Sequence, residues 1–273
     1  MKALVVLPTY NEAENLAPLA QEIFANTPEN TELLIIDDNS PDGTGKIADQ
    51  MAHKNPCVIA MHRPKKMGLG SAYVLAYQWA LARPYDIMIQ MDCDFSHDPK
   101  DLPRLIDALA ETDLVIGSRY VSGGSIENWP WVRSLISQAG NFYASAILGL
   151  GIKDMTGGFK AFRRKVIETM DLGTLVSDGY AFQIETTYHT LKNGFKVREI
   201  PIIFKDRTRG QSKISKRIIW EAIFSVWRLR FKKILETLLL CLSIVMILHY
   251  YFYFFTNHYL PNFLPGFMKK LGL

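Results

Sequence analysis

Short apolar runs alternate with amphipathic stretches along the front half of the chain. The apolar runs predict strands at Ala3–Leu7, Leu33–Ile36, Val58–Met61, Ile87–Met91 and Leu114–Ile116. Helical spacing of apolar positions predicts a helix from about Glu12 to Ala25, a second ending near Lys54, and a third at Gly70–Leu81. Continuous apolar strands separated by helices are typical of a parallel sheet covered on both faces, so an α/β fold is predicted.

The stretch from Gly123 to Phe204 has a mixed pattern. It predicts helices near Leu135–Leu148 and Tyr180–Leu191 and a strand near Val197–Phe204. Polar clusters follow several of the predicted strands of the front half. Because ligands of parallel sheets bind beyond the carboxyl ends of the strands, we expect the functional site at that edge.

The C-terminal region is apolar in a different way. Ser215–Phe231 is amphipathic and basic, as in helices that lie in a membrane interface, although packing on the body is an alternative. Ile234–Phe255 follows with Glu236 as its only charge, and 22 residues at about 1.5 Å each reach roughly 33 Å, enough for one membrane span rather than a buried core helix. We therefore expect a catalytic domain at 1–214, an interface helix at 215–233, a transmembrane helix at 234–255 and a tail at 256–273.

Composition and charge narrow the class of protein. The 273 residues are 48% hydrophobic, which excludes disorder, and the three cysteines show no metal or disulfide spacing, which favours a reducing compartment. Residues 205–233 carry a net charge of +8, whereas the whole chain carries +4, so the body is acidic and a nucleic-acid partner is not expected. The positive-inside rule then places the body in the cytoplasm, and the N-terminus lacks a signal-peptide pattern.

Two familiar phosphate-binding signatures are absent. Pro8-Thr9-Tyr10-Asn11-Glu12, rather than a glycine-rich turn, follows the first strand, and the segment from Gly68 lacks the third glycine of a dinucleotide motif. Gly43-Thr44-Gly45-Lys46 is followed by Ile47 instead of a hydroxyl residue. A dinucleotide-binding fold and a P-loop ATPase are therefore not predicted.

The sharpest local signal is a pair of acids, Asp92 and Asp94, at the end of the fourth predicted strand. Residues two apart on a strand project to the same side, so both carboxylates can hold a hard cation that also binds a diphosphate. A bare pair of this kind is more often a solvated turn. Here Asp37, Asp38 and Glu12 follow neighbouring strands, and this concentration of acids favours a cation site.

The residues beside this pair are assigned passive roles. Asp98 and Pro99 have the pattern of a helix N-cap followed by a first-turn proline. We expect Cys93 to contribute only its backbone and His97 to be a turn residue without a functional partner.

A series of motifs in fixed order identifies a family. They are Pro8–Glu12, Asp37–Thr44, Met91–His97, Gly117–Tyr120, Asn128–Pro130, Thr156–Phe159 and Asp206–Lys213. Together they make the chain resemble the polyprenol (dolichyl) phosphate mannose synthases of glycosyltransferase family 2, over about residues 1–215.

This resemblance implies a GT-A fold with a mainly parallel sheet, GDP-mannose as donor, a polyprenyl phosphate as acceptor, and Mg²⁺ or Mn²⁺. The positions that match the nucleotide-sugar site are Pro8, Tyr10, Glu12, Ile36, Asp38, Asp92, Cys93, Asp94 and Lys213. Asp92 and Asp94 match the metal positions, and Cys93 replaces the usual alanine. The positions that match the acceptor-phosphate site are Arg119, Arg133, Ser137 and Arg207. We take Asp92, Asp94, Arg119 and Arg207 as the catalytic set.

The chemistry expected of such a site is a direct displacement that inverts the anomeric carbon. For each arginine alone, an ordinary salt bridge is an equally good interpretation. One alternative donor is UDP-glucose on the same acceptor, and an alternative from another class is a non-catalytic membrane adaptor. A processive polysaccharide synthase is disfavoured because the chain has no Gln-x-x-Arg-Trp sequence. The expected location is a single-pass membrane protein with its catalytic domain in the cytoplasm.

Overall fold

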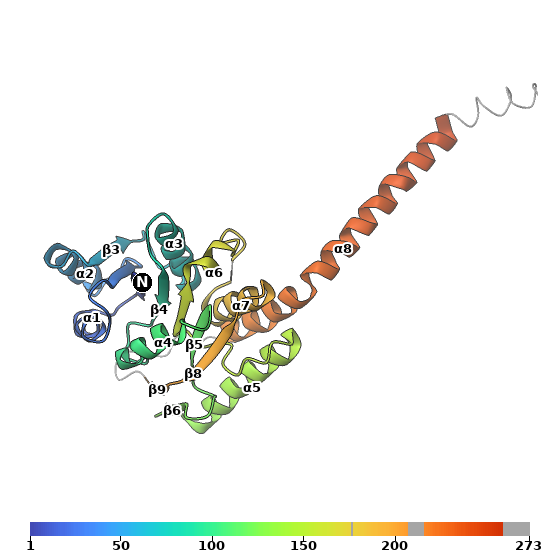
Figure 1. The fold of residues 1–273 in the computed structure, drawn as a ribbon. Helices are drawn as coiled ribbons and strands as arrows, with labels where there is room; N and C mark the ends of the chain where they lie inside the picture. Colours follow the sequence, from blue (N-terminus) through green and yellow to red (C-terminus); the bar gives the residue numbers. More distant parts are fainter. Residues whose placement is uncertain (176, 207–215, 259–273) are drawn as a thin grey trace, which may run out of the picture. The chain divides into compact units, whose positions relative to one another are not determined.

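A mainly parallel sheet organises the N-terminal part of the chain in a computed structural model, which describes residues 1–175, 177–206 and 216–258 (Figure 1). Within these residues, seven strands pair in the order β3-β2-β1-β4-β7-β5-β8. Their bounds are β1 Ala3–Thr9, β2 Glu32–Asp37, β3 Val58–His62, β4 Ile87–Gln90, β5 Leu114–Ser118, β7 Lys160–Arg163 and β8 Val197–Pro201. Only β7 runs antiparallel to its neighbours, pairing Gln90 and Ile116 with Lys160.

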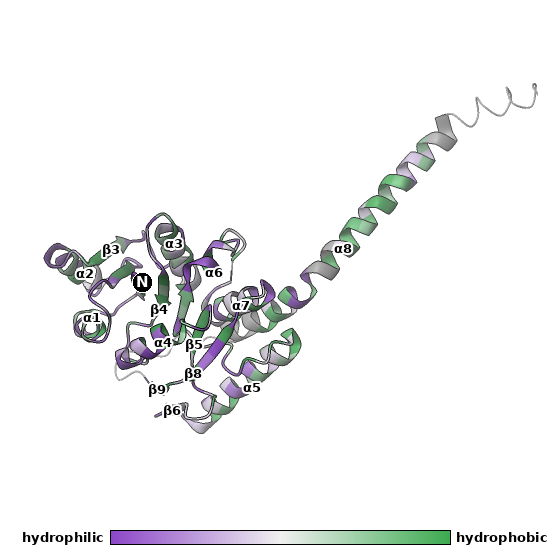
Figure 2. Cartoon of the chain, viewed as in Figure 1, coloured by the Kyte–Doolittle hydropathy of each residue, from purple (hydrophilic) through white to green (hydrophobic). Residues whose placement is uncertain are grey.

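Both faces of this sheet are covered by helices. Because successive strand residues point to opposite faces, Leu4 and Val6 pack with one layer while Val5 and Leu7 pack with the other. The first layer contains α3 (Leu69–Leu81), α5 (Trp131–Leu148), α6 (Arg164–Glu168) and α7 (Gly179–Lys192). The second contains α1 (Leu16–Ala25), α2 (Thr44–Lys54) and α4 (Leu102–Ala108). Figure 2 shows the strands β4 and β5 mainly in the green of hydrophobic residues, whereas the edge strand β8 is largely purple, in agreement with its partial exposure.

The predicted α/β class is confirmed, although several elements differ from the prediction. The first strand runs through Pro8 to Thr9, and its helix begins at Leu16 rather than Glu12. The strand β7 and the helix α6 were not predicted, because Lys160-Ala161-Phe162-Arg163 is too short and too polar to be recognised as a strand. The predicted helix near Leu135 begins earlier, at Trp131, directly after Pro130.

The predicted strand Val197–Phe204 is two strands in two sheets. β8 ends at Pro201, and β9 (Ile203–Lys205) pairs in parallel with β6 (Ser125–Glu127). The change of sheet follows from the backbone: the Ile202 N–H donates to the Ser118 carbonyl, and the Ser125 N–H donates to the Ile202 carbonyl. This small second sheet carries Phe204 to the edge where the parallel strands end.

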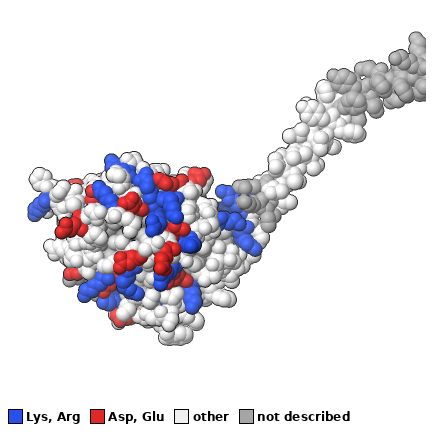
Figure 3. Space-filling model, viewed as in Figure 1, with Lys and Arg blue, Asp and Glu red and all other residues white. Residues whose placement is uncertain are grey.

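A long helix, α8 (Lys216–His258), forms the C-terminal part of the described chain. The chain divides into two compact units, Met1–Leu229 and Arg230–Leu273, so the boundary lies within this helix. The predicted interface helix and membrane span are thus parts of one continuous helix. Thr237–Phe254 has a mean hydropathy of 1.9 with none of this stretch buried, and it is long and apolar enough to cross a membrane. Figure 3 shows charges of both signs on the first unit. The part of Thr237–Phe254 that is not drawn in grey is white, so no charged residue appears there.

Two glycines at the start of α3 permit a close approach of α7. Gly68 has φ of +96°, and a side chain there would overlap the Asp178 carboxylate. A Cβ on Gly70 would overlap the Ser177 carbonyl oxygen and lie 3.1 Å from the Phe182 ring. Asp178 Oδ1 accepts hydrogen bonds from the Gly70 and Gly179 N–H groups, both at 2.8 Å, and so joins the first turns of both helices.

We predict that Gly70→Ala destabilises the protein by about 1–3 kcal/mol, because the added methyl group must displace the backbone of Ser177. The matched control is Gly140→Ala in α5, where a Cβ would meet nothing within 4 Å. There the higher helix propensity of alanine should stabilise by up to about 1 kcal/mol. Thermal unfolding of the detergent-solubilised chain measures both; equal melting temperatures for the two variants would contradict the close approach.

Candidate active site

One cavity, of about 340 Å³, opens where the parallel strands end. The loops after β1, β2, β4 and β5 line it together with residues 156–158, the start of α7 and the small sheet. The predicted site residues that line it are Pro8, Tyr10, Glu12, Asp38, Asp92, Cys93, Asp94, Arg119 and Arg133. The structure thus brings together residues from four separate strand ends, which is the arrangement expected of a ligand site in a parallel sheet.

Two predicted residues lie elsewhere. Ile36 is fully buried in the core beneath the sheet edge, so its side chain does not line the cavity. Ser137 lies on α5, where its hydroxyl accepts a hydrogen bond from the Tyr120 hydroxyl at 2.6 Å. Arg207 and Lys213 lie outside the described residues.

Four residues with left-handed backbone are sequence neighbours of residues that line the cavity. Of the non-glycine residues that the structure describes, Asn11, Asn39, Phe95 and Asn128 have positive φ, between 56° and 63°. Asparagine tolerates this conformation, but for a bulky residue such as Phe95 it is strained. All four stand in loops at the strand-end edge, so the backbone there is bent to present neighbouring side chains.

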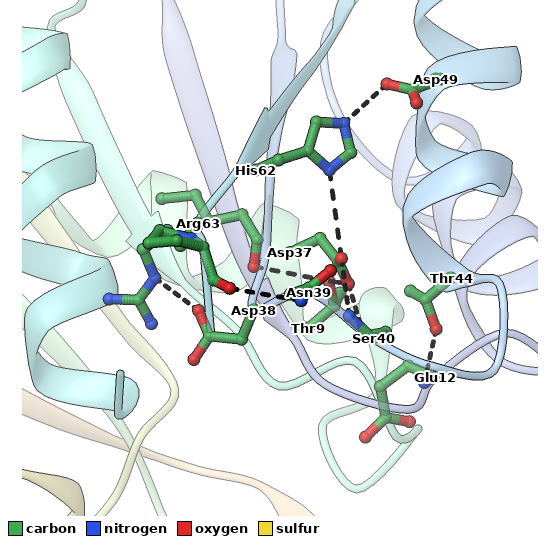
Figure 4. A network of polar contacts seen from close by, with 12 residues as sticks. Thr9, Glu12, Asp37, Asp38, Asn39, Ser40, Thr44, Asp49, His62 and Arg63 are labelled. Atoms are coloured by element: carbon green, nitrogen blue, oxygen red, sulfur yellow. Dashed lines mark hydrogen bonds and ion pairs between the residues drawn. The ribbon is translucent and has the colours of Figure 1, made fainter. Parts of the chain in front are cut away.

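At one end of the cavity, Asp38 is held by a buried arginine. Arg63 Nε donates to Asp38 Oδ1 (Figure 4). The Met67 N–H donates to Asp38 Oδ2 at 3.0 Å. The same guanidinium binds the Ser71 hydroxyl at 2.6 Å and the Gly68 carbonyl at 2.7 Å. Arg63 was not predicted as a site residue, because nothing in the sequence marks an arginine after β3 as the partner of Asp38.

The neighbouring Asp37 has a structural role. Its Oδ1 accepts from the hydroxyls of Thr9, at 3.2 Å, and Ser40, at 2.5 Å, and its Oδ2 accepts from the Ser40 N–H at 3.0 Å. These bonds tie the ends of β1 and β2 together (Figure 4). Asp37 was counted among the acids that favour a cation, but it does not line the cavity.

The Asp92–Asp94 loop is fixed by the residues that follow it. Asp94 Oδ1 accepts from the Ser96 N–H at 3.0 Å and from the Ser96 hydroxyl at 2.5 Å. The Asp92 N–H donates to His97 Nδ1 at 3.1 Å, and the His97 ring stacks on Phe159 with centroids 4.8 Å apart. His97 thus has structural partners that the sequence did not reveal: the ring holds the loop that presents both carboxylates, which is a passive role of the kind expected.

Burial decides the protonation of the groups beside these acids. It lowers the pKa of His97 despite the opposing charges of Asp92 and Asp94, so the ring is neutral at pH 7 and its proton is on Nε2. Burial also raises the pKa of the Cys93 thiol, and the side chain packs in the core. The Cys93 thiol is thus an inert part of the core.

At the other end of the cavity lies a buried ion pair. Asp154 is fully buried, and its carboxylate accepts from Arg119 Nε at 2.8 Å and from Arg119 Nη2 at 2.7 Å. Burial lowers the pKa of Arg119, but its charge interaction and hydrogen bonds with Asp154 outweigh this effect and raise it. Asp154 in turn is held by Glu199, which accepts from the Asp154 N–H at 2.8 Å and from the Ser118 hydroxyl at 2.7 Å. The pair was not foreseen in the sequence, because a lone aspartate after Lys153 forms no motif.

Arg133 lies beside this pair. Its Nη1 donates to both oxygens of Asp206, at 3.1 and 3.2 Å, and its guanidinium stacks on Trp129 at 3.8 Å. Arg133 Nε and Trp129 Nε1 are buried and have no hydrogen-bond partner among the residues that the structure describes. Both groups are donors only, so this end of the cavity is suited to an acceptor of hydrogen bonds.

Comparisons with known proteins agree with this geometry. Residues 4–171 match glycosyl transferase family 2. The chain is 47% identical over 233 residues to polyprenol monophosphomannose synthase of Mycolicibacterium smegmatis. This alignment covers 84% of this chain and 88% of the relative. It is 44% identical over 228 residues to undecaprenyl-phosphate mannosyltransferase of Micrococcus luteus, and this alignment covers 84% of this chain and 93% of that relative. The chain belongs to glycosyl transferase family 2.

A solved structure shares the fold of this family 2 glycosyltransferase. Glucosyl-3-phosphoglycerate synthase from Mycobacterium tuberculosis, in complex with Mn²⁺, UDP-glucose and phosphoglyceric acid, has a TM-score of 0.62 at 17% identity, over 84% of this chain and 79% of that one. The likeness confirms the predicted GT-A fold. The predicted family and the predicted glycosyltransferase class are both confirmed.

The acids of this glycosyltransferase fit a divalent cation that is shared with a ligand. Asp92 and Asp94 both line the cavity. Among the described residues, no group of three or more His, Cys, Asp or Glu side chains is placed to hold an ion. Mg²⁺ is commonly held by one or two carboxylates together with phosphate oxygens. The two carboxylates therefore suit an ion that arrives with a diphosphate.

A fully buried lysine lies beneath the cavity and was not predicted. Lys160 Nζ donates to the Gln183 carbonyl at 2.6 Å and to the Thr187 hydroxyl at 2.9 Å. Burial lowers the pKa of Lys160 to about 7, and the charge of Asp154 offsets part of the effect. The ordinary pKa of lysine, about 10.4, applies to the unfolded chain.

We predict a pH-dependent contribution of Lys160 to stability. Between about pH 7 and pH 10 the unfolded chain binds more protons at this residue than the folded chain, so stability rises with pH in this window. The melting temperature of the wild type relative to Lys160→Met should therefore increase from about pH 7 to pH 9. Lys54→Met, at an exposed position of α2, is the control and should show no such trend. Parallel curves for wild type and Lys160→Met would contradict the prediction.

Proposed function

We propose that this glycosyltransferase transfers mannose from GDP-mannose to a polyprenyl phosphate, with Mg²⁺ or Mn²⁺. The observation that carries the proposal is that one cavity is lined by the Asp92 and Asp94 carboxylates and also by Trp129 and Arg133, which have donor-only groups without a hydrogen-bond partner among the described residues. The names of the relatives from Mycolicibacterium smegmatis and Micrococcus luteus support mannose as the sugar and a polyprenyl phosphate as the acceptor.

The donor would bind along the strand ends. Asp92 and Asp94 would hold the cation together with the diphosphate, and the cation would stabilise the negative charge on the leaving diphosphate. Tyr10, Glu12 and Asp38 lie at the end of the cavity where the guanosine is proposed to bind. The hydrogen bonds of Ser96 and His97 keep the loop with both carboxylates in place before the donor arrives.

The acceptor phosphate would bind at the arginine end. A phosphate monoester has a second pKa near 6, so it is mostly dianionic at pH 7 and needs orientation more than a strong base. Arg133 would release Asp206 and bind the phosphate instead, and the Trp129 N–H would donate to a phosphate oxygen. Arg119 would add the positive charge of its guanidinium, which is paired with Asp154, and Arg207 remains a proposed contributor to this site. Lys213 remains a proposed contributor to the nucleotide-sugar site. Direct attack on the anomeric carbon would invert its configuration.

Exposed apolar side chains on α5 support a membrane-bound acceptor. Five side chains of this helix are between 46% and 76% exposed: Trp131, Val132, Leu135, Ile136 and Phe142. Val132, Leu135 and Ile136 follow Trp131 by one, four and five residues, so these four side chains lie on one face of the helix. Arg133 is on the same helix, so docking of this face on a bilayer would bring Arg133 to the level of the lipid phosphates. We further propose that Thr237–Phe254 crosses the membrane once, with the first unit in the cytoplasm.

The test of the proposed function is a transfer assay. Membranes containing the full chain should form a radiolabelled lipid from labelled GDP-mannose and not from UDP-glucose. Asp92→Asn and Asp94→Asn should each lower the rate by at least about 100-fold, because the charge that holds the cation with the diphosphate is lost. EDTA should abolish transfer, and added Mg²⁺ or Mn²⁺ should restore it. If labelled lipid formed from UDP-glucose and not from GDP-mannose, UDP-glucose would be the donor. Full turnover of both variants would contradict the proposed role of the two acids.

A second prediction concerns α5. Replacing Trp131 and Ile136 by serine removes two exposed apolar anchors, so transfer to a bilayer-embedded polyprenyl phosphate should fall by roughly tenfold or more. Transfer to a short-chain prenyl phosphate in detergent should be unchanged, because the arginine end is intact. Gln138→Ser, on the same helix, is the control and should match the wild type in both assays. Equal losses with both acceptors would instead indicate damage to the site itself.

A further inference from the structure

The most unusual polar group in the cavity is the side-chain amide of Gln183. Gln183 lies in the first turns of α7, is 2% exposed, and lines the cavity. Its Nε2 and Oε1 have no hydrogen-bond partner among the residues that the structure describes. A buried amide without a partner destabilises a fold by about 1–3 kcal/mol, and apolar isosteres avoid this cost. A glutamine in this setting is therefore suited to a partner that enters the cavity.

The position of this amide is given by Gly158. A Cβ built on Gly158 would lie 3.6 Å from Gln183 Nε2, 3.7 Å from His97 Cε1 and 3.9 Å from Asp92 Oδ1. The amide, the neutral imidazole and one metal-binding carboxylate thus face the same bare patch of backbone. Because Gly158 has no side chain, no methyl group stands among these three groups, and a ligand group that enters the cavity can approach them.

The main chain of Gln183 is rigidly held. Its carbonyl accepts hydrogen bonds from Lys160 Nζ at 2.6 Å, from the Thr187 hydroxyl at 3.0 Å and from the Thr186 hydroxyl at 3.1 Å. A fixed backbone restricts the directions that the side-chain amide can reach, as a recognition group requires.

The chemistry of the amide selects among the parts of a nucleotide sugar. A phosphate offers only acceptors, so it could use Nε2 but would oppose Oε1. The two donor-only groups, Trp129 Nε1 and Arg133 Nε, are at the arginine end instead. A sugar hydroxyl both donates and accepts, and two neighbouring hydroxyls can satisfy Oε1 and Nε2 at once. The amide therefore matches hydroxyl groups, and its place beside Asp92 matches the sugar attached to the diphosphate.

We propose that the Gln183 side-chain amide binds hydroxyl groups of the donor hexose over Gly158. This inference rests on the proposed function, because it assumes a nucleotide-diphosphate sugar in the cavity. Gln183 then recognises the sugar of the donor, whereas Asp38 and Tyr10 bind its nucleotide.

The first test is Gln183→Met, which keeps the length of the side chain and removes both hydrogen-bonding groups. Affinities for GDP and for GDP-mannose are measured by calorimetric titration of the full chain in detergent with Mn²⁺. GDP should bind as tightly as to the wild type, whereas GDP-mannose should bind roughly ten- to hundredfold more weakly, as expected for two lost hydrogen bonds. Without ligand, the melting temperature of the variant should equal or exceed that of the wild type.

Two further variants make the test specific. Gln90→Met removes another fully buried glutamine, whose Nε2 donates to the Tyr77 hydroxyl at 2.6 Å outside the cavity. It should lower the melting temperature but leave the ratio of the two affinities unchanged. Gly158→Ala adds one methyl group at ordinary contact distance from its neighbours, so the fold is kept. This variant should weaken GDP-mannose binding and spare GDP binding.

The outcomes separate this inference from the proposed function. If the wild type binds and transfers mannose but Gln183→Met has the wild-type affinity for GDP-mannose, an ordered water serves the amide and the inference is wrong. Equal losses for GDP and GDP-mannose would also overturn it, because the effect would then be on the nucleotide. If the wild type neither binds nor transfers mannose while another nucleotide sugar shows the Gln183 dependence, the donor proposal fails and sugar recognition by Gln183 holds.

Discussion

One antiparallel strand determines where the chemistry of this protein is placed. β7 lies between β4 and β5 and runs against both, so its amino-terminal end meets their carboxyl ends. The loop before β7 therefore carries Gly157 and Gly158 to the same edge as Asp92 and Arg119. A parallel strand at this place would put that loop at the opposite edge of the sheet. Both the acid end and the arginine end of the cavity border on this loop.

Charge is balanced separately at each end of the cavity. Arg119 is compensated by fully buried Asp154, Arg63 by Asp38, and Arg133 by Asp206. Burial of such pairs costs desolvation energy, so the pairs contribute more to the orientation of the groups than to stability. The half-buried pair Arg133–Asp206 differs from the other two, since an incoming anion can replace its carboxylate at lower cost. The fold thus holds two arginines in fixed positions and leaves one available for exchange.

The parallel half of the fold and the acids at its edge could be predicted from the sequence, whereas much of the supporting structure could not. The runs around Val5 and Ile35 are apolar enough to indicate strands, and Asp92 and Asp94 follow such a run directly. β7 contains a buried lysine, and its burial depends on acceptors from α7 far along the chain. Gln183 and Asp154 were missed for the same reason, because their surroundings form only when distant segments meet.

We propose that Asp92 and Asp94 bind, through a divalent cation, the diphosphate of a nucleotide sugar whose hexose faces Gly158. A structure of the full chain determined with GDP-mannose and Mn²⁺ tests this claim most directly. We expect the ion between Asp92, Asp94 and the diphosphate, the guanosine near Tyr10 and Asp38, and hydroxyl groups of the mannose at the Gln183 amide beside Gly158. A diphosphate bound at Arg119 and Arg133, away from both carboxylates, would contradict it.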